Sequence, residues 1–193
     1  MTLKKDSQMA KLPNILTLLR IALIPVVIFL FYLQNQTGHY VAAAIFILAC
    51  ITDYLDGYFA RTYDQTTDFG RFLDPIADKL LICSTLLLLV GFDHIKGLSL
   101  IPAIVILCRE ILVSGLREFL SETHLSMPVT TLAKWKTGLQ MSALSILIIA
   151  KPDHSLFSPA NAGLAGLWIA AALTLVTGYD YMKAGLKMVS SRS

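Results

Sequence analysis

The sequence predicts an all-α membrane protein with six transmembrane helices and both termini in the cytoplasm. Three observations lead to this fold class. Of the 193 residues, 55% are hydrophobic and only 15% are charged, whereas soluble domains average about 25% charged residues. The mean hydropathy is +0.66, and six apolar segments approach the length of about 20 residues that a membrane helix needs. Residues 1–193 are therefore expected to form a single integral membrane domain, with no nucleic acid among its partners.

The six predicted spans follow one another along the chain with short connections. They cover residues 12–33, 40–61, 69–90, 98–120, 130–149 and 164–182. In the first span Pro13 lies near the start, where its missing N–H costs little. The second loses its apolar character near Cys50, so we expect this helix to continue into the interface. The third opens with acidic residues and ends in the run LLICSTLLLLV.

The last three spans carry polar or small residues at characteristic places. Arg109 interrupts the fourth span, and Lys134 and Lys136 open the fifth. Gly163 and Gly166 make the start of the sixth rich in small residues, which favours close packing between helices or at a dimer interface. Four aromatic residues lie near predicted span ends and are expected to anchor the chain at the membrane interface: Trp135, Trp168, Tyr179 and Tyr181.

The distribution of basic residues predicts how the spans are oriented in the membrane. Cytoplasmic loops of membrane proteins carry an excess of lysine and arginine. Of the 16 such residues, all except Lys96 and Lys151 fall on the side of the N-terminus. An even number of spans then places both termini, and the whole stretch 53–78, at the cytoplasmic face.

The stretch DYLDGYFARTYDQTTDFGRFLDPIAD contains a cluster of acidic residues, which is unusual in so apolar a chain. A carboxylate in a membrane segment costs about 2.5–3.5 kcal/mol, so these groups need a partner. Asp53 and Asp56 are three residues apart near the end of the second span, and Asp74 and Asp78 are four apart at the start of the third. Each pair shares one helix face, and antiparallel neighbouring helices would bring the two faces together.

Converging carboxylates predict a metal site. Hard oxygen ligands select Mg²⁺, Mn²⁺ or Ca²⁺ over zinc, and two such ions about 3.5–4 Å apart suit phosphoryl-type displacements. The alternative is a salt-bridge network with Arg61, Arg71 and Lys79. Asp64 and Asp68 are interpreted as turn and first-turn residues.

The spacing of these residues resembles a known signature. It reads Asp53-x-x-Asp56-Gly57-x-x-Ala60-Arg61, then eight residues, then Gly70-x-x-x-Asp74-x-x-x-Asp78. This pattern resembles the signature of the CDP-alcohol phosphotransferases, and every position of the signature is filled. The resemblance implies six membrane helices, a homodimer, and transfer of a phosphatidyl-type group from a CDP-linked lipid to an alcohol with CMP as leaving group.

The resemblance also implies roles for individual residues. The four aspartates would hold two Mg²⁺ or Mn²⁺ ions, and Asp78 would serve in addition as the catalytic base for the acceptor hydroxyl. Asn14 and Arg20 would help at the nucleotide or lipid side. The CDP site would be lined by Asn14, Gly57, Arg61, Thr67 and Gly70.

A second polar set predicts the acceptor site. Arg109, Arg117, Lys134 and Lys136, set against Glu110 and Glu118, leave a positive pocket that suits an anionic acceptor such as a sugar phosphate or glycerol phosphate. The alternatives are that the two lysines are ordinary membrane anchors and that Arg109 only pairs with Glu110 or a neighbouring aspartate. The segments PNILTLLR, REILVSGLR and KWKTG resemble the bacterial branch of the family that uses glycerol 3-phosphate.

The predicted function is therefore phosphatidyl transfer from CDP-diacylglycerol to glycerol 3-phosphate, giving phosphatidylglycerol phosphate and CMP in phospholipid biosynthesis. The expected location is the inner membrane of a bacterium, with the active site facing the cytoplasm. Rivals of the same fold are cardiolipin, phosphatidylinositol phosphate and phosphatidylserine synthases. A small ion or metal transporter is the rival from another class, but the acidic residues cluster at one face and do not cross the bilayer.

Overall fold

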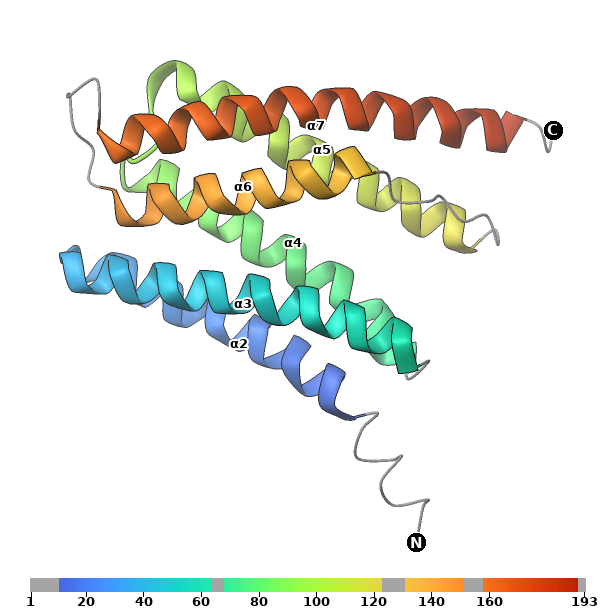
Figure 1. The fold of residues 1–193 in the computed structure, drawn as a ribbon, viewed down its shortest axis with the longest axis horizontal. Coiled ribbons are helices and arrows are strands. Elements are labelled where there is room, and N and C mark those ends of the chain that lie inside the picture. The colour runs from blue at the N-terminus through green and yellow to red at the C-terminus, as the bar shows by residue number, and fades with distance from the viewer. Residues whose placement is uncertain (1–10, 64–67, 123–130, 151–157, 191–193) are drawn as a thin grey trace, which may run out of the picture. The chain divides into compact units, whose positions relative to one another are not determined.

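Six long α-helices and one short 3₁₀ helix make up the described part of the computed structural model, which is residues 11–63, 68–122, 131–150 and 158–190 (Figure 1). The side chains of residues 11–14, 54–63, 68–72, 121–122 and 186–190 lie outside the description. The elements are α2 (Lys11–Tyr32), α3 (Gln36–Tyr63), α4 (Asp68–Gly91), η1 (Gly97–Ser99), α5 (Leu100–Glu122), α6 (Thr131–Ile149) and α7 (Pro159–Ser190). The predicted all-α class is confirmed.

α3 and α7 extend well beyond the apolar spans that predicted them. α3 has 28 residues and α7 has 32. At the start of α7, the Ser158 hydroxyl and carbonyl accept hydrogen bonds from the Asn161 N–H at 3.3 and 3.0 Å. Pro159 follows at the first helical position, where proline is well tolerated. Hydropathy marks the part of a helix that lipid covers, whereas the cap marks where the helix begins.

The apolar surface of the helices fits a lipid environment. Within the described residues, three segments are long and apolar enough to cross a membrane: Ile15–Tyr32, Gly97–Leu120 and Pro159–Gly185. Large apolar side chains point outward on each of them, among them Phe29, Ile104 and Leu175. So much exposed apolar surface is unusual for a soluble monomer, and this chain is a membrane protein.

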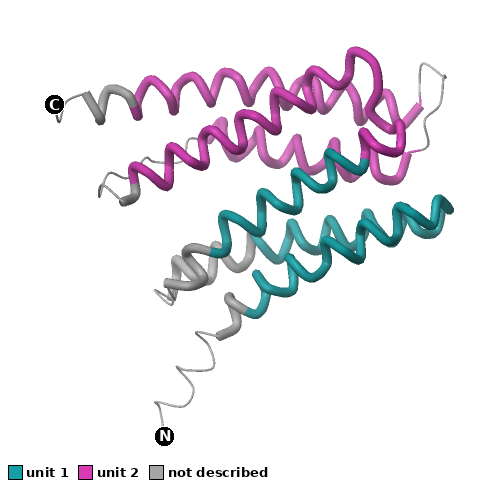
Figure 2. Tube along the Cα trace, turned by 180° about the vertical axis from the view of Figure 1, so that it is seen from behind, with its two compact units in different colours: residues 1–88 teal, residues 89–193 magenta. Residues whose placement is uncertain are grey.

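The chain divides into two compact units, residues 1–88 and 89–193, with the boundary inside α4 (Figure 2). In the first unit, α2 and α3 lie side by side. The turn between them contains Gln34 with φ 49°, and its N–H donates to the Phe31 carbonyl at 3.1 Å. The Asn35 side chain then caps α3 by accepting from the Gly38 N–H at 2.6 Å. Next to this turn, the buried rings of Phe31 and His39 pack edge to face, with their centroids 5.1 Å apart.

In the second unit, α7 packs against both α6 and α5. Its small residues allow this close approach. A Cβ atom at Gly163 would lie 2.8 Å from Leu147 Cγ, and one at Gly166 would lie 3.1 Å from the Cβ of Ala143. Of the two roles that the small-residue run allowed, these two glycines serve packing within the chain.

Replacing Gly163 by leucine is expected to destabilise the second unit, because the new side chain would enter the space that buried Leu147 fills. Overpacking of this kind costs about 1–3 kcal/mol, which corresponds to a Tm lower by about 2–12 °C at this chain length. Thermal unfolding of the purified protein in detergent measures the effect. The control is Ala165→Leu, because Ala165 lies exposed on the same helix. Equal Tm values for the two variants would contradict the packing role.

Candidate metal and substrate site

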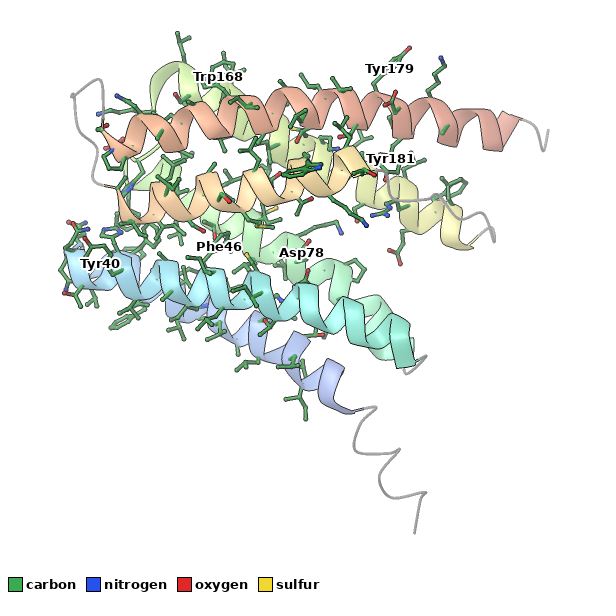
Figure 3. The ribbon with its side chains drawn as sticks, in the orientation of Figure 1. Tyr40, Phe46, Asp78, Trp168, Tyr179 and Tyr181 are labelled. Carbon is green, nitrogen blue, oxygen red and sulfur yellow. The ribbon has the colours of Figure 1, made fainter. Side chains whose placement is uncertain are left out.

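Three of the four predicted metal ligands have described side chains, and all three belong to the first unit. Asp53 lies on α3 and Asp74 lies on α4. Asp78, labelled in Figure 3, lies one turn after Asp74 on α4. Asp53 and Asp74 are close enough to interact electrostatically. Asp53 and Asp78 both interact with Cys50 in the same way. The structure therefore brings carboxylates from two helices together, although like charges repel.

Residues of α2 contact two of these carboxylates. Arg20 forms an ion pair with Asp53, with 2.7 Å between the guanidinium NH1 and Oδ1, and only 2% of the arginine side chain is exposed. The hydroxyl of Thr17, which is also buried, donates a hydrogen bond to Asp74 Oδ1. Residues three apart share a helix face, so one face of α2 orients a carboxylate on each of the other two helices.

The donor set fits a divalent cation. Arg20 forms an ion pair with one of the three carboxylates, Asp53, and the Lys79 ammonium donates a hydrogen bond to the Pro75 carbonyl at 2.7 Å. Carboxylate oxygens are the ligands that Mg²⁺ and Mn²⁺ prefer, so carboxylates drawn from two helices suit such an ion. No complete metal-binding group of three acidic, histidine or cysteine residues occurs among the described side chains, and the fourth predicted ligand, Asp56, is not one of them.

Most of the predicted CDP site falls outside the described side chains. The backbone of Asp56, Gly57 and Arg61 belongs to α3, and that of Gly70 belongs to α4. For their side chains the sequence-based assignments stay predictions. The predicted residues outside the described side chains are Asn14, Asp56, Gly57, Arg61, Thr67 and Gly70.

The predicted acceptor residues belong to the second unit, and two of them join one polar cluster. Buried Lys136 forms an ion pair with Glu110. Arg109 NH1 lies 3.6 Å from the same carboxylate oxygen, and Arg109 NH2 donates to Thr177 Oγ1 at 3.1 Å. The expected alternative, a pairing of Arg109 with Glu110, is therefore present. It leaves the cluster positive, because two cations share one carboxylate.

The predicted role of Tyr181 as an interfacial anchor is wrong. The residue was expected to anchor the chain at the membrane interface, but only 6% of it is exposed, whereas Tyr179 is 68% exposed. Residues two apart point to nearly opposite sides of a helix, so the two tyrosines cannot both face outward. Figure 3 shows them on opposite sides of α7. The guanidinium carbons of Arg109 and Arg117 lie 5.8 and 5.7 Å from the centroid of the Tyr181 ring.

The two lysines of α6 also point in different directions. Lys136 is buried and Lys134 is exposed. One turn beyond Lys136, on the same face, Gln140 is fully buried, and neither of its amide atoms has a hydrogen-bond partner within the described part of the chain. An unpaired buried polar group costs about 1–3 kcal/mol. This face of α6 is therefore better suited to a polar ligand than to hydrocarbon.

Sequence reasoning did not identify Thr17, Thr177, Tyr181 or Gln140 as site residues. Helical spacing offered a partial signal for the first three. Thr17 precedes Arg20 by three residues, and Tyr181 follows Thr177 by four, so each pair shares a face. Which neighbouring helix that face meets depends on tertiary packing, which spacing does not give.

Comparison with known proteins of similar sequence identifies the family of this chain. Residues 10–176 match the family model described as CDP-alcohol phosphatidyltransferase. A protein of Rickettsia typhi is 50% identical over 176 residues, covering 91% of this chain and 97% of its own length, and one of Pseudomonas fluorescens is 43% identical, covering 90% and 89%. A third, from Haemophilus influenzae, is 38% identical and covers 89% and 91%. All three are named CDP-diacylglycerol–glycerol-3-phosphate 3-phosphatidyltransferase. The chain therefore belongs to the CDP-alcohol phosphatidyltransferase family.

Proposed function

We propose that this protein transfers the phosphatidyl group of CDP-diacylglycerol to glycerol 3-phosphate, giving phosphatidylglycerol phosphate and CMP in phospholipid biosynthesis. The observation that carries the proposal is its 50% identity over nine-tenths of the chain to relatives named for this reaction. The positive cluster around Arg109 and Lys136 supports an anionic acceptor over a neutral one.

Asp53, Asp56, Asp74 and Asp78 would hold two Mg²⁺ or Mn²⁺ ions. When bound, the ions neutralise charge on the pyrophosphate and on the departing CMP. Arg20 and Thr17 keep Asp53 and Asp74 in fixed orientations before the substrate arrives. The nucleotide would be held by Gly57, Arg61, Thr67 and Gly70, with Asn14 at the nucleotide or lipid side.

Asp78 is proposed as the general base. Its carboxylate accepts the proton of the acceptor hydroxyl while the hydroxyl oxygen attacks the phosphorus that is esterified to diacylglycerol. The bond from that phosphorus to the CMP oxygen breaks, and CMP leaves. Arg109, Arg117, Lys134 and Lys136 would bind the phosphate of glycerol 3-phosphate. Lys136 and the two arginines provide close charge, and exposed Lys134 adds longer-range attraction.

The lipid tails of the donor and the soluble acceptor require a site at a membrane surface. Lysine and arginine lie almost entirely on one predicted side, which supports both termini and the site in the cytoplasm. We place the enzyme in the bacterial inner membrane, as one catalytic domain whose six helices all span it. The resemblance to the family supports a homodimer, which chemical cross-linking in membranes tests.

An acceptor panel tests the proposed function. Purified protein in detergent receives CDP-diacylglycerol and Mg²⁺ or Mn²⁺, and CMP release is measured with glycerol 3-phosphate, phosphatidylglycerol, inositol 1-phosphate or serine. We expect release with glycerol 3-phosphate and at most background with the others. Release only with phosphatidylglycerol or inositol 1-phosphate would assign one of the rival activities of the same fold.

Metal removal should abolish the reaction. With excess EDTA, CMP release from the wild-type protein is expected to fall to background, and added Mg²⁺ or Mn²⁺ should restore it, because the carboxylates alone would repel the pyrophosphate. Full activity in EDTA would contradict the metal site. Divalent-ion flux into liposomes that contain the protein, without any CMP release, would favour the transporter instead.

A further inference from the structure

Two arginines of α5 share one aromatic ring of α7. The guanidinium carbons of Arg109 and Arg117 lie 5.8 and 5.7 Å from the centroid of Tyr181. The ring is buried and only 12% of the Arg109 side chain is exposed, so water screens that contact little, whereas Arg117 is exposed. A guanidinium group within about 6 Å of an aromatic face is attracted by the negative charge of that face.

Neighbouring residues of α7 hold the side chain of Arg109 in this place. Thr177 Oγ1 accepts the hydrogen bond from Arg109 NH2 at 3.1 Å and donates its own proton to the Leu173 carbonyl at 2.9 Å. At Gly178, a Cβ atom would lie 3.1 Å from Arg109 Cγ, so the absence of a side chain leaves room for the arginine stem. Three residues within two turns of α7 thus fit this one arginine.

The two arginines lie close together although like charges repel each other. Two guanidinium groups close to one ring repel each other, and the described carboxylate of the cluster, Glu110, already pairs with Lys136 and lies near Arg109. The ring reduces the repulsion without cancelling the charge. What remains is a pair of cations, held together and still able to bind an anion. Guanidinium forks match the geometry of phosphate oxygens.

We propose that Tyr181 is a positioning residue that determines acceptor specificity, because its ring holds Arg109 and Arg117 together as a clamp for the phosphate monoester of the acceptor. This inference rests on the proposed function. The two arginines lie within residues 10–176, the part that matches the family model, whereas Thr177, Gly178 and Tyr181, which position them, lie beyond it.

The test compares Tyr181→Leu with Tyr181→Phe and with Tyr179→Leu. Loss of two cation–π contacts in Tyr181→Leu is expected to raise the KM for glycerol 3-phosphate by about 5- to 30-fold, with the KM for CDP-diacylglycerol unchanged. Inorganic phosphate, as a competitive inhibitor, should lose affinity by the same factor. Tyr181→Phe keeps the ring and should stay within about threefold of wild type. Tyr179→Leu alters the exposed tyrosine of the same helix and should behave as wild type.

Three outcomes overturn the inference while the wild type remains active with glycerol 3-phosphate. They are an unchanged KM in Tyr181→Leu, equal rises in both KM values, and a fall in kcat alone. If Tyr181→Leu does not fold, Thr177→Val tests the inference in its place, because it removes only the hydroxyl that holds Arg109. It should raise the KM for glycerol 3-phosphate and the Ki for phosphate together, and no rise in either counts against the clamp. A wild-type protein that releases no CMP with glycerol 3-phosphate refutes the proposed function itself.

Discussion

Replacing Asp78 by asparagine is expected to lower the rate of CMP release by about 100- to 10,000-fold, the range by which a general base accelerates a reaction. The amide has nearly the shape of the carboxylate, so the packing of α4 should be preserved. It cannot accept the proton of the acceptor hydroxyl, and it is a weaker ligand for a divalent ion. The rate should therefore stay low even at saturating Mg²⁺.

The controls for Asp78→Asn separate lost chemistry from lost structure. Asp93→Asn makes the same change at an exposed residue of the loop after α4, and it should leave rate and Tm unchanged. Thermal unfolding of Asp78→Asn should also resemble wild type. Binding of CDP-diacylglycerol, measured with radiolabelled lipid, should persist in part because the remaining aspartates are intact. A near-normal rate would refute the assignment of Asp78 as the base.

Lys136→Met should have the second-largest effect, on the acceptor. Lys136 is buried and paired with Glu110, and its loss removes one positive charge from the cluster and leaves Glu110 to oppose an anionic ligand. A hydrogen bond to a charged group contributes about 1.5–3 kcal/mol, so kcat/KM for glycerol 3-phosphate should fall by about 10- to 100-fold. Steady-state kinetics with varied glycerol 3-phosphate measures this.

Two further lysine substitutions serve as controls for Lys136→Met. Lys134→Met removes the exposed lysine two residues earlier, and we expect a smaller effect that weakens further at high salt, because water and ions screen exposed charges. Lys96→Met, in the exposed loop before α5, should change nothing. A Lys136 variant with unchanged kinetics and a lowered Tm would mean that this lysine only balances the charge of Glu110.

The fold class was predictable because membrane helices depend on local composition. Apolar runs predicted six helices, but they did not give the full lengths of α3 and α7. The caps at Asn35 and Ser158, which are ordinary turn residues in an apolar chain, mark those helix starts. The acidic residues were identifiable because four carboxylates in such a chain need a partner. The contacts from Thr17 to Asp74 and from Tyr181 to two arginines join helices that are distant in sequence, and no local pattern contains them.

Arg20 has a consequence for how the chain enters the membrane. An arginine within an apolar helix costs about 2.5–3.5 kcal/mol to insert when it has no partner, and α2 is synthesised before α3. The partner of Arg20 is Asp53, in the second half of α3, so the favourable ion pair can form only after both helices are in place. Neither charged helix inserts as well alone as the two do together. We therefore expect α2 and α3 to integrate into the bilayer as one hairpin, in which each charge on one helix lowers the insertion cost of the charge on the other.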